Sequence, residues 1–443
     1  MSEFKYKKRI VDTMLRRRLM TMGAVLIEGP KLCGKSTTAM QQAASVLNME
    51  PGRTLELARL DPKLILQGEV PRLIDEWQLA PNLWDAIRRE VDARNGEKGQ
   101  FMLTGSAVPV DVSLLKHSGT GQFAWLKMRP MTLVESGESS GAVSLTALFA
   151  GKHGIGCASN GSLEETAFCA CRGGWPPALQ LEPEYALDHA FNYVEAIIHA
   201  DISRADNVKR NEETTRRLLR AYARHQGAQI SAPELAKDIE GSEGRGVTDK
   251  TILGYLNALK KIFVIEDLPA WNPNLRSKTA IRTSDTRYFS DPSIAAGALG
   301  IEPQDLLLAP ETFGFVFETL CVRDLRVYAE ALDGNLYHYR DKSGLECDAV
   351  IHRRNGTYGL IEIKLGSEQG IADGVRTLKA LADKLDTSKM QKPSFLMVLT
   401  ALGDFLLIDA TTVSLLSPLR VWDRSRISYR NVKKVNAPAR MRI

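Results

Sequence analysis

The sequence contains no long apolar segment and no paired cysteine motif. Its 443 residues include no apolar run of the roughly 18 residues that a membrane-spanning helix needs. The charged stretch at residues 1–9 is not followed by the apolar core of a secretory signal. The six cysteines are scattered without a C-x-x-C pair, and Cys169 and Cys171 have the wrong spacing for a zinc knuckle. These absences predict a cytoplasmic protein with reduced thiols and no membrane partner.

Charge and length set further limits. The formal net charge is only +5, and the excess of basic residues lies at residues 16–18 and in the C-terminal tail from residue 420 onward. Such clusters suit a polyanion such as DNA, although solvated basic surfaces are also common. A chain of 443 residues exceeds the size of one hydrophobic core, so we expect roughly two or three domains and find no internal repeat.

Residues 29–36, with the sequence GPKLCGKS, form a complete phosphate-binding loop of the pattern G-x-x-x-x-G-K-[ST]. The apolar run 24–27 precedes it as a buried strand would, and residues 37–44 follow as a helix. Phosphates then lie at a helix N-terminus, where free N–H groups and the helix dipole favour anions. The loop predicts ATP or GTP binding, and the alternative is a glycine-rich turn without a ligand. The residues expected to bind the nucleotide are Gly29, Pro30, Cys33, Gly34, Lys35, Ser36, Thr37 and Asp75.

Two carboxylates follow the apolar residues 73–74, as at the end of a parallel strand. Asp75 and Ser36 are expected to hold Mg²⁺ together, and Glu76 is expected to polarise the attacking water. The alternative is a strand that simply ends at solvated acids. A third strand, at residues 100–103, leads to Thr104, whose hydroxyl could sense the terminal phosphate or merely belong to a turn.

Small polar residues near 135–141 end this first module, and helical patterns continue to about residue 211. Residues 212–270 then predict three helices followed by a strand at 263–265, which is the pattern of a winged helix. Such a unit reads DNA in some proteins and is a packing module in others. The exposed face of its third helix is expected to carry Thr248, Lys250, Thr251, Asn257 and Lys260.

The C-terminal part predicts strands at 336–340, 346–351 and 359–365. Period-two alternation puts Glu362 and Lys364 on one face of the third strand, and a hairpin through residues 353–356 brings Asp348 beside Glu362. Glu318, in a helical stretch, could add a carboxylate. Two acids and a lysine suit metal-assisted phosphodiester cleavage, in which the acids hold Mg²⁺ and the lysine acts on a water. The alternative is a half-exposed hairpin with solvated charges.

Taken in order, these segments resemble a family of prokaryotic AAA-type ATPases whose C-terminal region is the domain of unknown function DUF4143. The segments are residues 29–36, 72–78, 103–106, 129–133, 172–176 and 339–364. The resemblance implies an α/β protein with a P-loop NTPase (AAA-like) parallel-sheet core, a winged helix and a restriction-endonuclease-like α/β domain of the PD-(D/E)xK type. It assigns Lys35, Ser36, Asp75 and Glu76 to ATP, and it assigns Glu318, Asp348, Glu362 and Lys364 to the nuclease-like site. The domain boundaries expected are 1–140, 141–211 for a helical linker or lid, 212–270, and 271–443 with the basic tail.

One departure concerns hydrolysis. Relatives usually carry an arginine in the segment 117–122, where this chain has Gln122. If that arginine reaches a neighbour's nucleotide, its loss weakens hydrolysis, and Arg129 is the candidate to replace it.

Two functions follow as hypotheses. One is an ATP-regulated, Mg²⁺-dependent nuclease or DNA-processing factor. The other is a nucleotide-switched protein that binds DNA or protein while its nuclease-like domain is silent. Homo-oligomerisation and an unidentified protein partner stay open.

Overall fold

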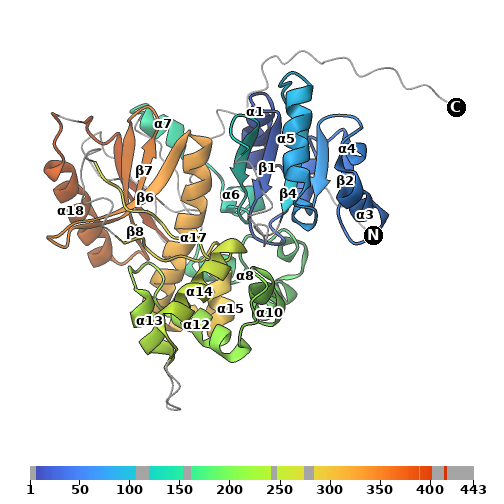
Figure 1. The fold of residues 1–443 in the computed structure, drawn as a ribbon. Helices are drawn as coiled ribbons and strands as arrows, with labels where there is room; N and C mark the ends of the chain where they lie inside the picture. Colours follow the sequence, from blue (N-terminus) through green and yellow to red (C-terminus); the bar gives the residue numbers. More distant parts are fainter. Residues whose placement is uncertain are drawn as a thin grey trace.

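The computed structural model describes residues 6–105, 119–152, 161–240, 247–273, 284–388, 390–401 and 414–416. Two α/β lobes lie side by side above a helical region (Figure 1). The first lobe holds a five-stranded parallel sheet in the order β2-β3-β4-β1-β5. Its strands are β1 (Ala24–Glu28), β2 (Ser45–Asn48), β3 (Arg72–Asp75), β4 (Phe101–Gly105) and β5 (Phe123–Lys127).

Both faces of this sheet are covered. Val25 and Ile27 of β1 pack toward α1 and the helical region, whereas Ala24 and Leu26 pack toward α3 to α5. Burial on both faces is typical of parallel strands, which explains the continuous apolar run in β1. The surrounding helices are α1 (Val11–Leu19), α2 (Lys35–Met40), α3 (Arg53–Leu60), α4 (Pro62–Ile65), the 3₁₀ turn η1 (Trp77–Leu79), α5 (Leu83–Ala93) and α6 (Leu133–Ser136).

The predicted helix over residues 37–44 is wrong in length. Helix α2 ends at Met40, because the chain must turn and enter β2 at Ser45. The N–H of Ala44 donates to the carbonyl of Pro71 at 2.8 Å, so the last predicted residues already approach the neighbouring strand.

The helical region follows α7 (Leu145–Phe149). It contains α8 (Leu163–Arg172), η3 (Ala178–Gln180), α9 (Pro183–Ala186), α10 (Asp188–Ala196), the π-helical turn η4 (Ile197–Asp201), α11 (Ile202–Arg204), α12 (Glu212–Arg224), α13 (Ala232–Ile239), α14 (Asp249–Lys261), α15 (Pro292–Leu299) and α16 (Pro303–Leu308). Ser231 and Glu234 form the capping box that starts α13. The strand predicted at 263–265 is reduced to isolated antiparallel bridges, Ile265 with Phe289 and Leu268 with Thr286.

The second lobe holds a mixed five-stranded sheet in the order β10-β9-β8-β7-β6. Strands β6 to β8 are antiparallel, whereas β9 and β10 run parallel to β8. The long helix α17 covers the face that faces the first lobe, and α18 covers the other face (Figure 1). The elements are α17 (Pro310–Ala331), β6 (Gly334–Arg340), β7 (Glu346–Arg353), β8 (Tyr358–Lys364), α18 (Glu368–Lys384), β9 (Phe395–Thr400) and β10 (Ser414–Leu416).

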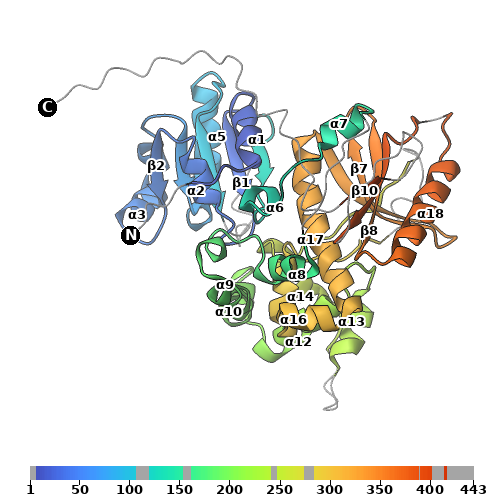
Figure 2. The ribbon, with the colours of Figure 1, turned by 180° about the vertical axis from the view of Figure 1, so that it is seen from behind.

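A buried ionic cluster, which we call the junction, joins the lobes. Figure 2 shows α6 between the first sheet and α17. Arg323 of α17 pairs with Asp291 at 3.0 Å and with Asp324 at 2.7 Å, and all three side chains are almost fully buried. Asp291 accepts from the backbone N–H of Gly174, and Asp324 accepts from that of Leu133. The junction therefore ties the first lobe and the helical region to α17.

No helix in the described parts of the chain has both the length and the apolar character to cross a membrane.

Candidate functional site

The phosphate loop connects the end of β1 to the start of α2. A Cβ on Gly29 would lie 2.0 Å from the carbonyl oxygen of Met128, so only glycine fits there. Gly34 is left-handed, with φ +96°, and allows the sharp entry into α2. The ammonium of Lys35 donates to the carbonyls of Gly29 at 2.9 Å and Pro30 at 2.7 Å, which holds the lysine across the loop.

Asp75 gathers the polar groups expected around the phosphates. Its Oδ1 atom accepts from the hydroxyl of Ser36 at 2.8 Å and from that of Thr104 at 2.5 Å. The backbone N–H of Glu76 donates to the same oxygen at 3.1 Å. These residues come from three adjacent elements, since β4 lies between β1 and β3 and all three strands end at the same edge. A hydroxyl and a carboxylate side by side are the donor set that Mg²⁺ takes in a phosphate-loop protein.

Glu76 adopts a left-handed backbone, with φ +55°, immediately after β3. This conformation is unfavourable for a residue other than glycine, and such residues cluster at functional sites. The half-buried carboxylate of Glu76 accepts from the side-chain amide of Gln78. The backbone and Gln78 together orient Glu76 beside Asp75.

The outer side of the loop is fastened to other elements. The guanidinium of Arg9 donates to the carbonyls of Cys33 and Arg129, each at 2.8 Å, and it also pairs with Glu135. Lys31 pairs with Asp201 of the η4 turn, with 2.5 Å between Nζ and Oδ1. No local sequence pattern predicts these contacts. Thr37 lies half-buried in α2, where its carbonyl accepts from Gln41, and Cys33 is fully buried.

Arg129 occupies a different environment from that of an exposed arginine finger. Its buried guanidinium donates to Glu266 at 2.7 Å and to Glu330 of α17 at 2.9 Å. Burial alone would raise the pKa of Glu266, but Arg129, Arg326 and Lys127 together hold that pKa well below its usual range. Arg129 is therefore an interdomain ion-pair partner in this conformation.

Gln122 lies at the N-terminal end of β5, where its amide donates to Asp92 at 3.1 Å. Its carbonyl accepts from the N–H of Ala24, the first residue of β1. The phosphate loop follows the other end of β1. Position 122 therefore lies at the end of the sheet opposite the phosphate loop. Residues 106–118, which include Ser106 and His117, lie outside the described residues.

A second polar group forms on the hairpin of β7 and β8. The ammonium of Lys364 lies 2.6 Å from Glu362 Oε2 and 3.0 Å from Asp348 Oδ2. The structure therefore brings together the two acids and the lysine that the alternation pattern grouped. Burial and the charge of Asp348 raise the pKa of Glu362 to about 8. Burial acts to lower the pKa of Lys364, but the two carboxylates outweigh it and raise that pKa.

Glu318 lies on α17, and its carboxylate accepts from the hydroxyl of Tyr288. Its pKa is raised to about 8 by burial and by the charge of Asp348, so the two acids are within electrostatic reach. Over the described ranges, however, no group of three or more His, Cys, Asp or Glu side chains is arranged to hold a metal. The expected three-ligand set of Glu318, Asp348 and Glu362 is therefore not assembled in this conformation, because Tyr288 holds Glu318 and Lys364 bridges the other two.

The residues expected on the outer face of α14 are exposed. Thr248 caps the helix, and its hydroxyl lies 2.9 Å from that of Thr251. Lys260 instead pairs with Asp267 at 2.6 Å, which directs its charge toward the protein.

Comparison with known domain families divides the chain into three segments. Residues 21–136 match an AAA domain, and residues 313–410 match the domain of unknown function DUF4143. The chain is an AAA-type protein with a C-terminal DUF4143 domain. Residues 163–305, which cover α8 to α15, match a further domain of unknown function, DUF8612. A comparison of the chain with curated proteins found no match. The AAA domain contains the phosphate loop and Asp75, and the DUF4143 domain contains the β7–β8 hairpin.

Proposed function

We propose that this protein binds and hydrolyses ATP with Mg²⁺ at the phosphate loop, and that the nucleotide controls a nuclease-like site in the DUF4143 domain that acts on DNA. The first part rests on one observation: Ser36, Thr104 and the N–H of Glu76 converge on a single oxygen of Asp75. The match of residues 21–136 to an AAA domain supports the same activity.

Each residue has a role that its chemistry suits. Lys35 neutralises the β and γ phosphates, and Ser36 and Asp75 hold Mg²⁺, whose charge offsets that of the transferred phosphoryl group. Glu76, oriented by Gln78, accepts a hydrogen bond from the attacking water and draws its proton. Thr104 bonds Asp75 and keeps its carboxylate directed at the loop.

ATP affinity tests the role of Lys35. The substitution Lys35→Ala removes a charge-assisted contact, so ATP binding should weaken about tenfold to a hundredfold. The exposed Lys63→Ala in the same domain is the matched control and should bind ATP as the parent does. Isothermal titration with Mg·ATP measures both. An unchanged affinity in Lys35→Ala would remove the loop from the nucleotide site.

The nuclease-like site rests on the hairpin. Asp348 and Glu362 share one ammonium, and the Oε1 atom of Glu362 is buried without a hydrogen-bond partner among the described residues. An unsatisfied buried carboxylate oxygen is costly, and a cation would satisfy it. These residues fit a site for a divalent ion, with Asp348 and Glu362 as its ligands. Lys364 would orient a water molecule or help to deprotonate it. The alternative is a catalytically silent domain in which the ammonium of Lys364 takes the place of the ion. The absence of a three-ligand metal site among the described residues favours this alternative.

Thermal stability in Mg²⁺ or Mn²⁺ separates these alternatives. The titration uses the Lys35→Ala protein without nucleotide, so that ATP cannot carry metal to the first site. An ion bound by Asp348 and Glu362 should raise the melting temperature by mass action, and Asp348→Asn should abolish the gain. Asp383→Asn, an exposed acid on α18, is the control and should keep it. If Asp348→Asn keeps the full gain, the ion binds elsewhere.

The proposed DNA contact rests on the helical region. Three helices, α12 to α14, and the paired segments after them support a winged helix, and α14 exposes Thr248, Lys250 and Asn257. The Lys260–Asp267 pair supports the packing role instead. Five described cysteines are free and buried, which supports a reducing, cytoplasmic setting.

A further inference from the structure

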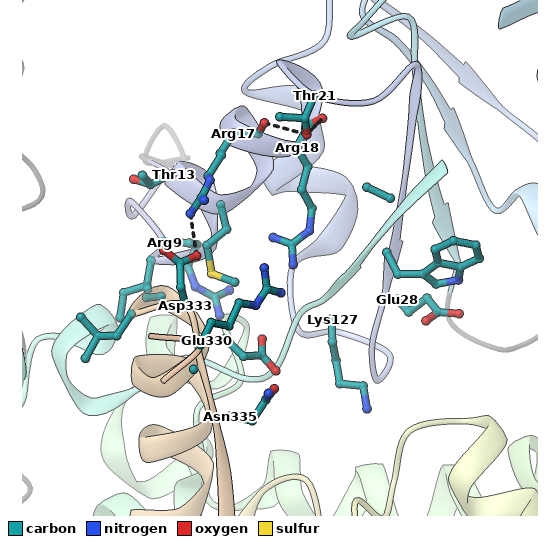
Figure 3. Close-up of a pocket in the computed structure, with 18 of the residues that line it drawn as sticks. Arg9, Thr13, Arg17, Arg18, Thr21, Glu28, Lys127, Glu330, Asp333 and Asn335 are labelled. Carbon is teal, nitrogen blue, oxygen red and sulfur yellow. Dashed lines mark hydrogen bonds and ion pairs between the residues drawn. The ribbon is translucent and has the colours of Figure 1, made fainter. Parts of the chain in front are cut away.

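A cavity away from the phosphate loop lies between the first lobe and the second lobe. Its volume is about 790 Å³, which is in the range of small-molecule sites. Helix α1 and strand β5 line one side, and the end of α17 and the start of β6 line the other (Figure 3). None of its described lining residues belongs to the phosphate loop at residues 29–36. The cavity is therefore separate from the proposed ATP site.

Most charged groups of the cavity are already neutralised. Six basic and four acidic residues line it. Ion pairs account for most of them: Arg9 with Glu135, Arg17 with Asp333, Lys127 with Glu266, and Glu330 with Arg129. Burial raises the pKa of the remaining acid, Glu28, although the positive charge of Lys127 acts to lower it. An excess of positive charge is left over.

Arg18 and Arg354 contribute to that excess. Neither forms an ion pair or a side-chain hydrogen bond within the described residues, although each has five N–H donors. Arg18 points into the cavity from α1 (Figure 3). Burial lowers its pKa, and the charges of Arg354 and Arg17 lower it further, whereas Glu330 and Asp333 act in the opposite direction. Two guanidinium groups that repel each other across a cavity favour an anion between them.

The apolar side chains of the cavity suit a flat aromatic ring. Trp125 lies on β5, the edge strand of the sheet, and 46% of its surface is exposed. The cavity also includes Met14, Met22 and Leu332. A base can stack on an exposed indole, and such stacking is a common source of affinity for nucleotides. Phosphate-binding arginines beside an indole are thus complementary to a nucleoside phosphate.

We propose that this cavity binds a free nucleotide, with its phosphate between Arg18 and Arg354 and its base against Trp125. The site is distinct from the phosphate loop. Because its walls come from both lobes, an occupant contacts α1 of the first lobe and the α17–β6 connection of the second lobe at once.

Binding is measured on the Lys35→Ala protein, which weakens the phosphate loop. Isothermal titration uses AMP, ADP, inorganic phosphate and a short dT oligonucleotide as probes. AMP or ADP should bind, and Arg18→Gln or Arg354→Gln should weaken that binding about tenfold to a hundredfold. Trp125→Leu should weaken nucleotide binding but not phosphate binding. Arg220→Gln, an exposed arginine on α12 outside the cavity, is the matched control and should change nothing.

Tryptophan fluorescence gives a readout that does not depend on the arginine variants, since a stacked base should quench Trp125 and the quenching should disappear in Trp125→Leu. Absence of nucleotide binding, or equal affinity in the protein carrying both arginine substitutions, overturns the proposal. Binding of the oligonucleotide without any mononucleotide also overturns it, because the ligand would then be a nucleic-acid strand.

Discussion

Replacing Glu76 with glutamine is expected to lower ATP turnover by about two to four orders of magnitude while ATP stays bound. Glutamine keeps the size and the contact with Gln78 but cannot draw a proton from water. The left-handed backbone at this position makes the orientation of the side chain sensitive to bulkier changes, so the isosteric substitution is the appropriate one. Phosphate release at saturating Mg·ATP, together with an ATP titration, measures both effects.

Glu56→Gln is the matched control for this experiment. Glu56 is an exposed acid on α3, and its substitution should leave turnover at the parental rate. Parental turnover in Glu76→Gln would mean that another group positions the water. A loss of ATP affinity that accounts for the lost turnover would instead make Glu76 a binding residue.

The largest loss of stability is expected from Arg323→Met. The substitution keeps much of the side-chain volume but leaves Asp291 and Asp324 without their shared cation. Both carboxylates are almost fully buried. Removing one partner from a buried ion pair costs about 3 to 5 kcal/mol of unfolding free energy. Burial already raises the pKa of Asp324 to about 6 in the presence of Arg323. Thermal and urea denaturation should show the loss in the transition that includes α17.

Arg340→Met provides the contrast, since Arg340 pairs with Glu346 and both side chains are about half exposed. Exposed pairs contribute at most about 1 kcal/mol, so this variant should melt close to the parent. Equal stability of the two variants would show that the junction does not hold the lobes together.

Local patterns predict much of this structure. The phosphate loop, its flanking strand and the acids after β3 are contiguous signals, and each depends on neighbours only a few residues away. Alternation along β8 groups Glu362 with Lys364 for the same reason, and the short hairpin brings Asp348 to them. In these places the local geometry of a strand or turn fixes the position of the side chain.

Contacts between distant segments escaped prediction. Arg129 suggested a finger, but Glu266 and Glu330, which fix its position, lie 137 and 201 residues away in the sequence. Glu318 was expected beside the metal, yet Tyr288 holds its carboxylate. The junction of Arg323 with Asp291 shows the same limit. No periodicity encodes such pairs, because they depend on how the lobes pack.

These distant pairs also form a chain of contacts between the two proposed sites. Arg9 bonds the phosphate loop at Cys33 and the carbonyl of Arg129, whose side chain reaches Glu330 at the end of α17. Helix α17 also carries Glu318 and packs against β7 and β8. A movement of the loop on nucleotide binding therefore has a contiguous route of contacts to the hairpin.

Cleavage of supercoiled plasmid and single-stranded DNA, with Mg²⁺ or Mn²⁺ and with or without ATP, is the decisive test of an ATP-controlled nuclease. We expect metal-dependent cleavage whose rate changes with ATP, and we expect Lys364→Ala to eliminate cleavage while ATP hydrolysis continues. Cleavage that persists in Lys364→Ala, or no cleavage of any DNA form by a protein that binds ATP, would contradict it and leave a nucleotide-switched binding protein.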